Sequence, residues 1–213
     1  MKPNSVKVWS SDAVAKSKGC FEFTDCDIFK HTCVNTVAHE TSSDLRLLKE
    51  HAPRPLKQKD VKFASLNIQS LTNKTLILND FISDHDIGIL CLSETWHRSG
   101  DYLTLNETTP AGYNYIEKAR SSGRGGGLAV FYRDTFGLVE LQVPDSPSFE
   151  CLAARCLTPE PLLIVSIYRP PRDNSTFISD FSNLLTILCP TFSRLVILGD
   201  FNIHIDACDG APV

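Results

Sequence analysis

After residue 60, apolar residues fall into short runs with the length and spacing of buried strands. Residues 61–67 alternate between apolar and polar positions, which predicts a strand. Residues 86–94 form a nearly continuous apolar run that ends in polar residues, the pattern of a strand buried on both faces. Four more runs predict strands, at residues 126–132, 149–156, 162–168 and 194–198.

Two segments between these runs have the periodicity of helices. Apolar positions within residues 71–82 follow the spacing of one helix face, and residues 174–188 predict a second helix with Asn174 or Ser175 as its N-cap. Strands and helices mix without the strict alternation of a parallel βαβ fold. The pattern therefore predicts an α/β fold in which sheets pack together and helices cover them.

The first 60 residues differ from the rest of the chain. Residues 1–60 carry 10 Lys/Arg and 8 Asp/Glu, a net charge of +2, whereas residues 61–213 carry 11 and 17, a net charge of −6. Residues 51–60 contain two prolines and several charges, which is typical of a linker. We expect residues 1–60 to be a poorly structured extension and linker, with one helix around residues 43–51, followed by a domain over residues 61–213.

Charge and hydropathy restrict where the protein works. The net charge of −4 argues against a protein held to nucleic acid by bulk charge, yet it allows an enzyme that contacts DNA through a local basic groove. No apolar run reaches the roughly 18 to 20 residues that a membrane span needs, and residues 1–10 lack the apolar core of a signal peptide. We expect an intracellular protein of the nucleus or cytoplasm, not secreted and without a membrane partner, whose eight cysteines are reduced.

Four predicted strands end in residues that can bind a metal ion or a phosphate. These ends carry Asn67, Glu94, Tyr168 with Arg169, and the run 199–202 with Asp200 and Asn202. Strand ends that gather at one edge of a sheet are where α/β folds place their sites. The sequence therefore predicts that these side chains converge. Taken singly, each also has an ordinary explanation as a turn residue, a solvated acid or a half-buried aromatic.

Together these side chains suit phosphodiester hydrolysis with a hard cation. Glu94 can supply a carboxylate and Asn67 an amide oxygen to Mg²⁺, with Mn²⁺ as a possible substitute. Asp200 can orient or deprotonate the attacking water, and Asn202 can hold that water or the phosphate. Tyr168 can donate a hydrogen bond to a phosphate oxygen as negative charge develops on it.

Basic residues near these motifs are candidates for contacts with the DNA backbone. Arg169 directly follows Tyr168, while Arg120 and Arg124 lie beside a glycine cluster at residues 123–127. The cluster is not a nucleotide-binding loop, because no Gly-Lys-Ser/Thr follows it and the next element is a predicted strand. A solvated hairpin tip is the alternative explanation for Arg120 and Arg124.

In this order, the motifs resemble the endonuclease/exonuclease/phosphatase family. More narrowly, they resemble the apurinic-type endonuclease of non-LTR (LINE-type) retrotransposons. The motifs are residues 66–70, 92–96, 167–171 and 199–202, with a glycine-rich strand at 125–133, and the resemblance covers about residues 61–206. It implies a four-layer α/β sandwich and Mg²⁺-dependent nicking of DNA to prime reverse transcription. DNA is the implied partner, with no organic cofactor, and the oligomeric state stays open.

The resemblance also implies a role for each matching residue. Asn67 and Glu94 correspond to residues of the family's metal site, and Tyr168 corresponds to its phosphate-contacting tyrosine. Asp200 and Asn202 correspond to the Asp-x-Asn pair that handles the nucleophilic water.

One departure from the family concerns the C-terminus. The family continues with further strands and closes its site with a Ser-Asp-His motif. Here Val213 comes thirteen residues after Asp200, and the one histidine beyond Asp200 is His204, in the segment directly after the last predicted strand. We therefore expect a C-terminally truncated, degenerate endonuclease with weak or no activity. Two alternatives are a non-catalytic remnant and a phosphatase that acts on lipid or nucleotide phosphates.

Overall fold

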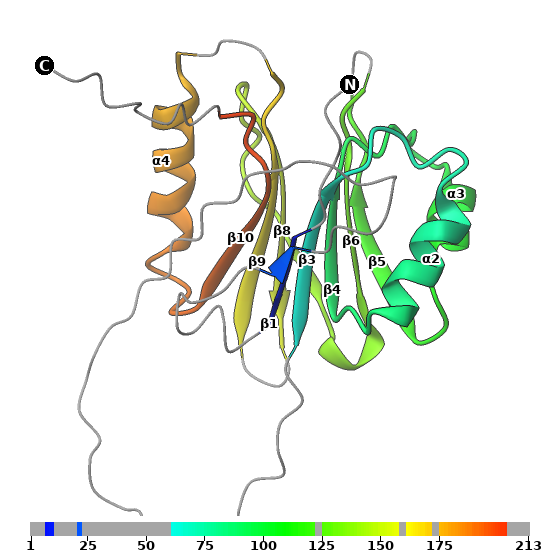
Figure 1. The fold of residues 1–213 in the computed structure, drawn as a ribbon. Coiled ribbons are helices and arrows are strands. Elements are labelled where there is room, and N and C mark those ends of the chain that lie inside the picture. Colours follow the sequence, from blue (N-terminus) through cyan, green and yellow to red (C-terminus); the bar gives the residue numbers. More distant parts are fainter. Residues whose placement is uncertain are drawn as a thin grey trace, which may run out of the picture.

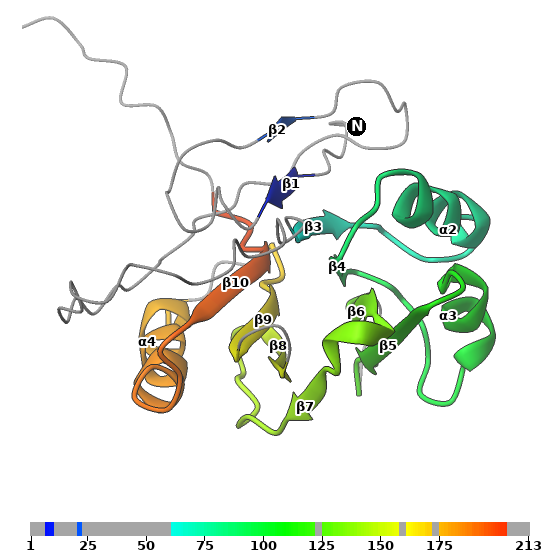
Figure 2. The ribbon, with the colours of Figure 1, turned by 90° about the horizontal axis from the view of Figure 1, so that it is seen from below.

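The computed structural model describes residues 61–121, 125–157, 161–171 and 175–203, together with the strand backbone at residues 7–10 and 21–22. Two β-sheets lie face to face in this structure, and helices cover the outer side of each sheet (Figures 1 and 2). The result is the predicted α/β fold, with layers in the order helix, sheet, sheet, helix. The predicted helix at residues 43–51 and the predicted linker at 51–60 lie outside the described residues.

The first sheet has six strands in the order β2-β1-β3-β4-β6-β5. Their bounds are Lys7–Ser10 for β1, Phe21–Glu22 for β2, Lys62–Asn67 for β3, Ile89–Ser93 for β4, Tyr113–Lys118 for β5 and Leu128–Arg133 for β6. Strands β3 and β4 are parallel, and Asn67 pairs with Ser93 at their carboxyl ends. This register brings Asn67 next to the residue that precedes Glu94.

The second sheet has four strands in the order β10-β9-β8-β7. Their bounds are Val139–Leu141 for β7, Glu150–Cys156 for β8, Leu162–Tyr168 for β9 and Leu195–Asp200 for β10. Strands β9 and β10 are parallel, and Tyr168 pairs with Asp200 at their carboxyl ends. Each sheet therefore contributes one parallel pair whose ends carry predicted site residues.

Three apolar layers hold the sheets and helices together. Helices α2 (Thr75–Asp84) and α3 (Tyr102–Thr108) lie on the six-stranded sheet, and α4 (Phe177–Leu188) lies on the four-stranded sheet (Figure 2). Buried side chains fill the space under α2 and α3, the space between the sheets and the space under α4. Strand β4 is buried along its whole length, as its continuous apolar run predicts, because it has apolar layers on both faces.

All six predicted strands are present, with boundaries shifted by a few residues. The sequence did not predict α3, β5, β7 or the two N-terminal strands. Strand β5 escaped detection because it lies at a sheet edge and mixes polar and aromatic residues that are mostly half-buried. The N-cap of α4 is Thr176, not Asn174 or Ser175, and its hydroxyl binds the Asp180 carboxylate instead of capping a backbone N–H.

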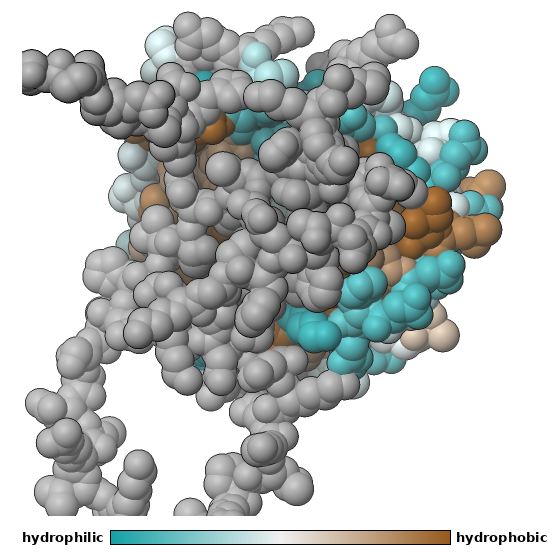
Figure 3. All heavy atoms as spheres, viewed as in Figure 1, coloured by the Kyte–Doolittle hydropathy of each residue, from teal (hydrophilic) through white to brown (hydrophobic). Residues whose placement is uncertain are grey.

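Several apolar side chains on the outer helices remain exposed. Leu76 of α2 is 71% exposed and Leu103 of α3 is 68% exposed. Figure 3 shows apolar surface on the side of the molecule where Figure 1 places α2 and α3. Among the described residues, no helix is both long enough and apolar enough to cross a bilayer. Exposed apolar residues of this kind are common on folded proteins.

The described cysteines are free thiols that differ sharply in their surroundings. Burial raises the pKa of Cys91 to about 12 and that of Cys151 to about 12, whereas Cys189 is exposed. Since the thiolate is the reactive form, we expect iodoacetamide at pH 8 to alkylate Cys189 in the native protein and to spare Cys91 and Cys151. Peptide mass spectrometry after quenching checks this. Labelling in urea, where all three should react, is the control, and equal native labelling would contradict it.

Candidate active site

The residues predicted from strand ends meet at one edge of the two sheets. Asn67 ends β3, Glu94 follows β4, Tyr168 ends β9 and Asp200 ends β10. The first two belong to the six-stranded sheet and the other two to the four-stranded sheet. Direct hydrogen bonds join all four side chains, so the predicted convergence is present.

Asn67 bridges the two carboxylates of the site. Its Nδ2 donates to Glu94 Oε1 at 2.9 Å and to Asp200 Oδ2 at 2.7 Å. Because both oxygens bind the same nitrogen, Glu94 Oε1 and Asp200 Oδ2 are no farther apart than the sum of these two distances. The side-chain oxygen of Asn67 accepts a hydrogen bond from the backbone of Gln69 at 3.2 Å, and the residue is only 7% exposed. Asn67 is therefore fixed between two acids that would otherwise repel each other.

Two more side chains donate hydrogen bonds to the Glu94 carboxylate. The Tyr168 hydroxyl donates to its Oε1 at 2.8 Å, and the Trp96 indole Nε1 donates to its Oε2 at 3.3 Å. The Glu94 backbone has a φ of 54° and that of Trp96 a φ of 55°, a left-handed conformation that is uncommon for residues other than glycine. Backbone bonds to Gly126 and Gly127 hold this turn in place. The strained turn aims the Glu94 carboxylate across the sheet edge toward Asp200.

Asp200 is connected to the loop that follows β10. Its Oδ1 accepts the backbone N–H of Asn202 at 3.0 Å, and its Oδ2 lies 3.4 Å from Asn202 Nδ2. The same amide donates to the Arg169 carbonyl at 2.6 Å. Asn202 has a φ of 45°, which turns its side chain back beside Asp200. The Asp-x-Asn pair thus acts as one hydrogen-bonded unit at the end of β10.

Arg169 does not point freely into the site. Its guanidinium donates to the carbonyls of Phe201 and Asn202, at 3.2 and 3.1 Å, and lies over the Phe177 ring at 4.8 Å from the centroid. These contacts stabilise the loop that carries Asn202. A phosphate contact of Arg169 stays a prediction, while loop positioning is what its contacts support.

Arg120 lies at the rim of the site, and Arg124 lies outside the described residues. The Arg120 guanidinium forms an ion pair with Glu150 and lies 5.8 Å from the centroid of the Tyr168 ring. Glu150 also accepts the backbone N–H of Gly127 at 2.7 Å. Glu150 therefore links Arg120 to the start of β6, and nothing in the sequence around Glu150 indicated this role.

Burial changes the proton affinities of the site. It raises the pKa of Tyr168 above its usual range, and the hydrogen bond to Glu94 adds to this shift. Burial also raises the pKa of Asp200, the hydrogen bonds from Asn67 and Asn202 oppose this shift, and the Glu94 charge adds to it. Tyr168 is therefore held in its donor form, and Asp200 is a stronger base than a solvated aspartate.

The donor set fits a hard divalent cation. Two carboxylates, with the remaining positions left to water, are ligands of the kind that Mg²⁺ takes. Asn67 turns its N–H₂ to both acids and its oxygen to the Gln69 backbone, so in this arrangement it positions the carboxylates and offers the cation no oxygen. In the part of the chain that the structure describes, no group of three or more His, Cys, Asp or Glu side chains gathers that could hold a metal ion, so the candidate protein ligands are the two carboxylates alone. Glu94, with Asp200 opposite, would hold such a cation, and Asn67 would keep the two carboxylates in position.

The letters Ser-Asp-His occur once in the chain, at residues 83–85, but in a different place in the fold. This tripeptide ends α2, and the His85 carbonyl accepts a hydrogen bond from Lys62 at the start of β3. Asn67 ends the same strand, roughly 16 Å away at the usual rise per residue. Residues 83–85 therefore lie at the opposite end of the sheet and cannot complete this site.

Comparison with known proteins identifies the family. The model of the endonuclease/exonuclease/phosphatase family matches residues 64–208, more than half of the chain. The chain belongs to this family, whose enzymes generally depend on divalent metal ions and hydrolyse phosphodiester bonds. A search of curated proteins gave no match.

Solved structures support the fold. One similar structure is an AP endonuclease from Archaeoglobus fulgidus, with 18% identity, a TM-score of 0.54 and coverage of 67% of this chain and 58% of that protein. Another is a variant of the 3′ phosphatase NExo from Neisseria bound to a product DNA hairpin, with 18% identity, a TM-score of 0.51 and coverage of 66% and 57%. The chain thus spans less than two thirds of the length of each.

The indole of Trp96 provides a direct probe of metal binding. The chain has two tryptophans, and replacing Trp9 by Phe leaves Trp96 as the single reporter. Because Trp96 Nε1 binds Glu94 Oε2, we expect Mg²⁺ to change its fluorescence in a saturable way that EDTA reverses. The same titration of Glu94→Gln should show a much weaker response. An equal response in both proteins would remove Glu94 from the metal site.

Proposed function

We propose that this chain carries the phosphodiester-hydrolysing site of a Mg²⁺-dependent DNA endonuclease related to those of LINE-type retrotransposons. The observation that carries the proposal is the pair of carboxylates from two sheets, Glu94 and Asp200, held together by one donor, Asn67. Such an arrangement is costly for folding alone, because it brings like charges together in a partly buried place. It is well suited to a bound cation and a phosphate.

The residues divide the work as follows. Glu94, with Asn67 beside it, holds the cation, which when bound offsets charge on the phosphate. Asp200 accepts a proton from the attacking water, and its raised pKa improves it as a base. Asn202 orients that water, since its amide already lies beside Asp200. Tyr168 stays protonated and donates its hydroxyl hydrogen to a phosphate oxygen as charge develops there.

DNA as the substrate and retrotransposon origin rest on the motif series. The order of residues 66–70, 92–96, 167–171 and 199–202 resembles LINE-type endonucleases more closely than the family's phosphatases. The two similar structures are an AP endonuclease and an enzyme bound to a DNA hairpin, which supports DNA as the substrate. Contacts of Arg120 and Arg124 with the backbone of that DNA belong to the proposal, and the nearness of Arg120 to the Tyr168 ring supports the first of them.

A second candidate is a domain that binds metal and DNA without cleaving. The observation that favours it is coverage, because the chain spans 58% and 57% of the lengths of the two similar enzymes. The groups described above would then form part of a site that needs further residues for turnover. Members of a catalytic unit act non-additively, so one missing part can remove most of the rate.

Plasmid nicking decides between these candidates. The chain, and a version extended by the C-terminal half of a LINE-type endonuclease, are incubated with supercoiled DNA in Mg²⁺, in Mn²⁺ and in EDTA. Metal-dependent nicking by the chain itself supports the enzyme. Nicking by the extended version alone supports the binding domain. If neither protein nicks DNA while both are folded, the proposed function is wrong.

A further inference from the structure

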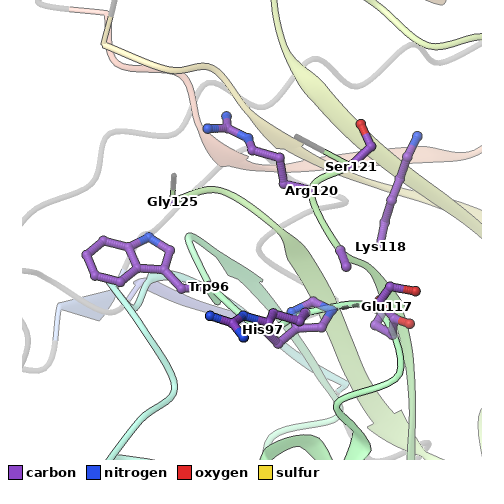
Figure 4. A pocket seen from close by; sticks show the side chains of 10 residues that line it. Trp96, His97, Glu117, Lys118, Arg120, Ser121 and Gly125 are labelled. Carbon is purple, nitrogen blue, oxygen red and sulfur yellow. Dashed lines mark hydrogen bonds and ion pairs between the residues drawn. The ribbon is translucent and has the colours of Figure 1, made fainter. Parts of the chain in front are cut away.

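A groove lies directly beside the carboxylate site, and of the residues that line it only Arg120 has a role in the function proposed above. It has a volume of about 670 Å³ and is lined by residues 96–99, 117–121 and 125 (Figure 4). One wall is the loop after β4, which begins at Glu94, and the other is the end of β5 with the segment that follows it. The groove therefore continues from the position where the scissile phosphate would lie.

The floor of the groove is a buried hydrogen-bonded chain. His97 Nε2 lies 2.7 Å from Glu117 Oε2, and His97 Nδ1 lies 2.7 Å from the Thr95 hydroxyl. The His97 side chain is 1% exposed. This chain ties the loop after β4 to β5 and keeps the two walls at a fixed separation.

Trp96 is held in place but not buried. Its Nε1 binds Glu94, and a side chain at Gly125 would come within 3.3 Å of the same nitrogen, so the glycine makes room for the indole. Even so, Trp96 is 50% exposed. Figure 4 shows its ring pointing away from His97 and Glu117. An aromatic ring with a fixed orientation and a free surface is a stacking platform.

Three cations line the same groove. Arg98 is exposed and, among the described residues, forms no ion pair. Lys118 pairs with Asp145 at 2.7 Å, and the Arg120 guanidinium pairs with Glu150. Arg98 is thus the cation most readily available to a phosphate, and the other two make the surroundings favourable for an anionic strand.

We propose that this groove binds an unpaired nucleotide of a single DNA strand, next to the phosphodiester at the carboxylate site. Its base stacks on Trp96, and its backbone phosphate pairs with Arg98. The indole surface suits only an unpaired base, because bases within a duplex are already stacked on one another. The inference rests on the proposed function for its choice of DNA, and it adds a preference for single-stranded or locally opened substrates.

Binding in EDTA tests the inference apart from catalysis. Fluorescence anisotropy of a labelled oligothymidylate is measured with the full chain, beside a hairpin duplex with the same number of phosphates. We expect the single strand to bind more tightly than the hairpin. Trp96→Ala should weaken oligothymidylate binding by about tenfold or more. Trp96→Phe should retain most of it, because the ring stays and only the indole N–H is lost. Thermal melts confirm that each variant is folded.

Matched controls use exposed residues outside the groove. Tyr102 of α3 is an aromatic residue with 52% exposure, and Tyr102→Ala should leave binding unchanged. Arg98→Ala should reduce the slope of the logarithm of the binding constant against the logarithm of the salt concentration by about the value of one phosphate contact. Arg155→Ala on β8 should leave this slope unchanged. The inference is overturned if Trp96→Ala and Trp96→Phe both bind oligothymidylate as tightly as wild type, or if the hairpin binds as tightly as the single strand.

Failure of this inference can be told apart from failure of the proposed function. Trp96-dependent binding of oligothymidylate by a protein that never nicks DNA, even when extended, would support the groove and contradict the endonuclease. Metal-dependent nicking by a protein whose oligothymidylate binding ignores both Trp96 substitutions would support the endonuclease and overturn the groove.

Discussion

Glu94→Gln should reduce metal-dependent nicking by about a thousandfold or more in whichever chain, original or extended, nicks DNA. The substitution removes the charge that holds the cation. It also places an amide N–H₂ among donors, because both Glu94 oxygens accept hydrogen bonds, from Asn67 and Tyr168 on one side and Trp96 on the other. The measurement is the initial rate of conversion of supercoiled to nicked plasmid at saturating Mg²⁺.

Glu140→Gln is the matched control for this substitution. Glu140 is an exposed glutamate of β7, and its side chain contacts only Gln142 in the bonds seen among the described residues. The same chemical change at Glu140 should leave the nicking rate within about twofold, as surface substitutions usually have small effects. A Glu94→Gln protein that nicks within a few fold of wild type would show that the carboxylate at the end of β4 does not take part in hydrolysis.

The site residues could be predicted from the sequence because the residues that can bind a metal ion or a phosphate lie at the ends of the predicted strands. Asn67, Glu94, Tyr168 and Asp200 each follow an apolar run, and parallel strands place such ends at one edge. The hydrogen bonds that join site residues of one sheet to those of the other could not be predicted from the sequence. Asn67 and Asp200 are 133 residues apart, and only the packing of one sheet on the other makes Asn67 a shared donor for both acids.

Two basic residues show the limit of reasoning from sequence position. Arg169 adjoins Tyr168 in sequence, yet its guanidinium turns to the carbonyls of the loop after β10. Arg120 is held by Glu150, whose position on β8 has no relation in sequence to the glycine cluster. A cation near a site motif is therefore not automatically a phosphate ligand, because nearby carbonyls and carboxylates compete for it.

Residues 83–85 show that a tripeptide that matches a family motif need not lie at the site. They spell Ser-Asp-His, but helix α2 carries them to the end of the sheet opposite Asn67. Two of the elements missed from the sequence, β5 and α3, are partly exposed, so their apolar pattern is too weak to detect. Burial on both faces made β4 and β9 easy to predict, and its absence hid the edge strands.

Gly199→Ala should be the most destabilising single substitution near the site. Gly199 lies in β10 with a φ of 145°, where side chains are rarely tolerated, and it pairs with Ile167 of β9. A Cβ at this position would collide with the backbone carbonyl of Ile167, which cannot move without breaking the parallel pair. We expect a loss of about 3 kcal/mol or more in the free energy of unfolding, as backbone strain and a steric clash act together.

The same substitution should also disable the site, because Gly199 directly precedes Asp200. Gly137→Ala is the control: Gly137 has a φ of 55°, and nothing lies within 4 Å of a Cβ built there. That variant should lose only about 1 kcal/mol, the cost of the left-handed conformation alone. Urea unfolding followed by circular dichroism compares the two, and Trp96 fluorescence reports Mg²⁺ binding in each. If Gly199→Ala were no less stable than Gly137→Ala and still bound Mg²⁺, the close approach of β9 and β10 would not be what positions Asp200.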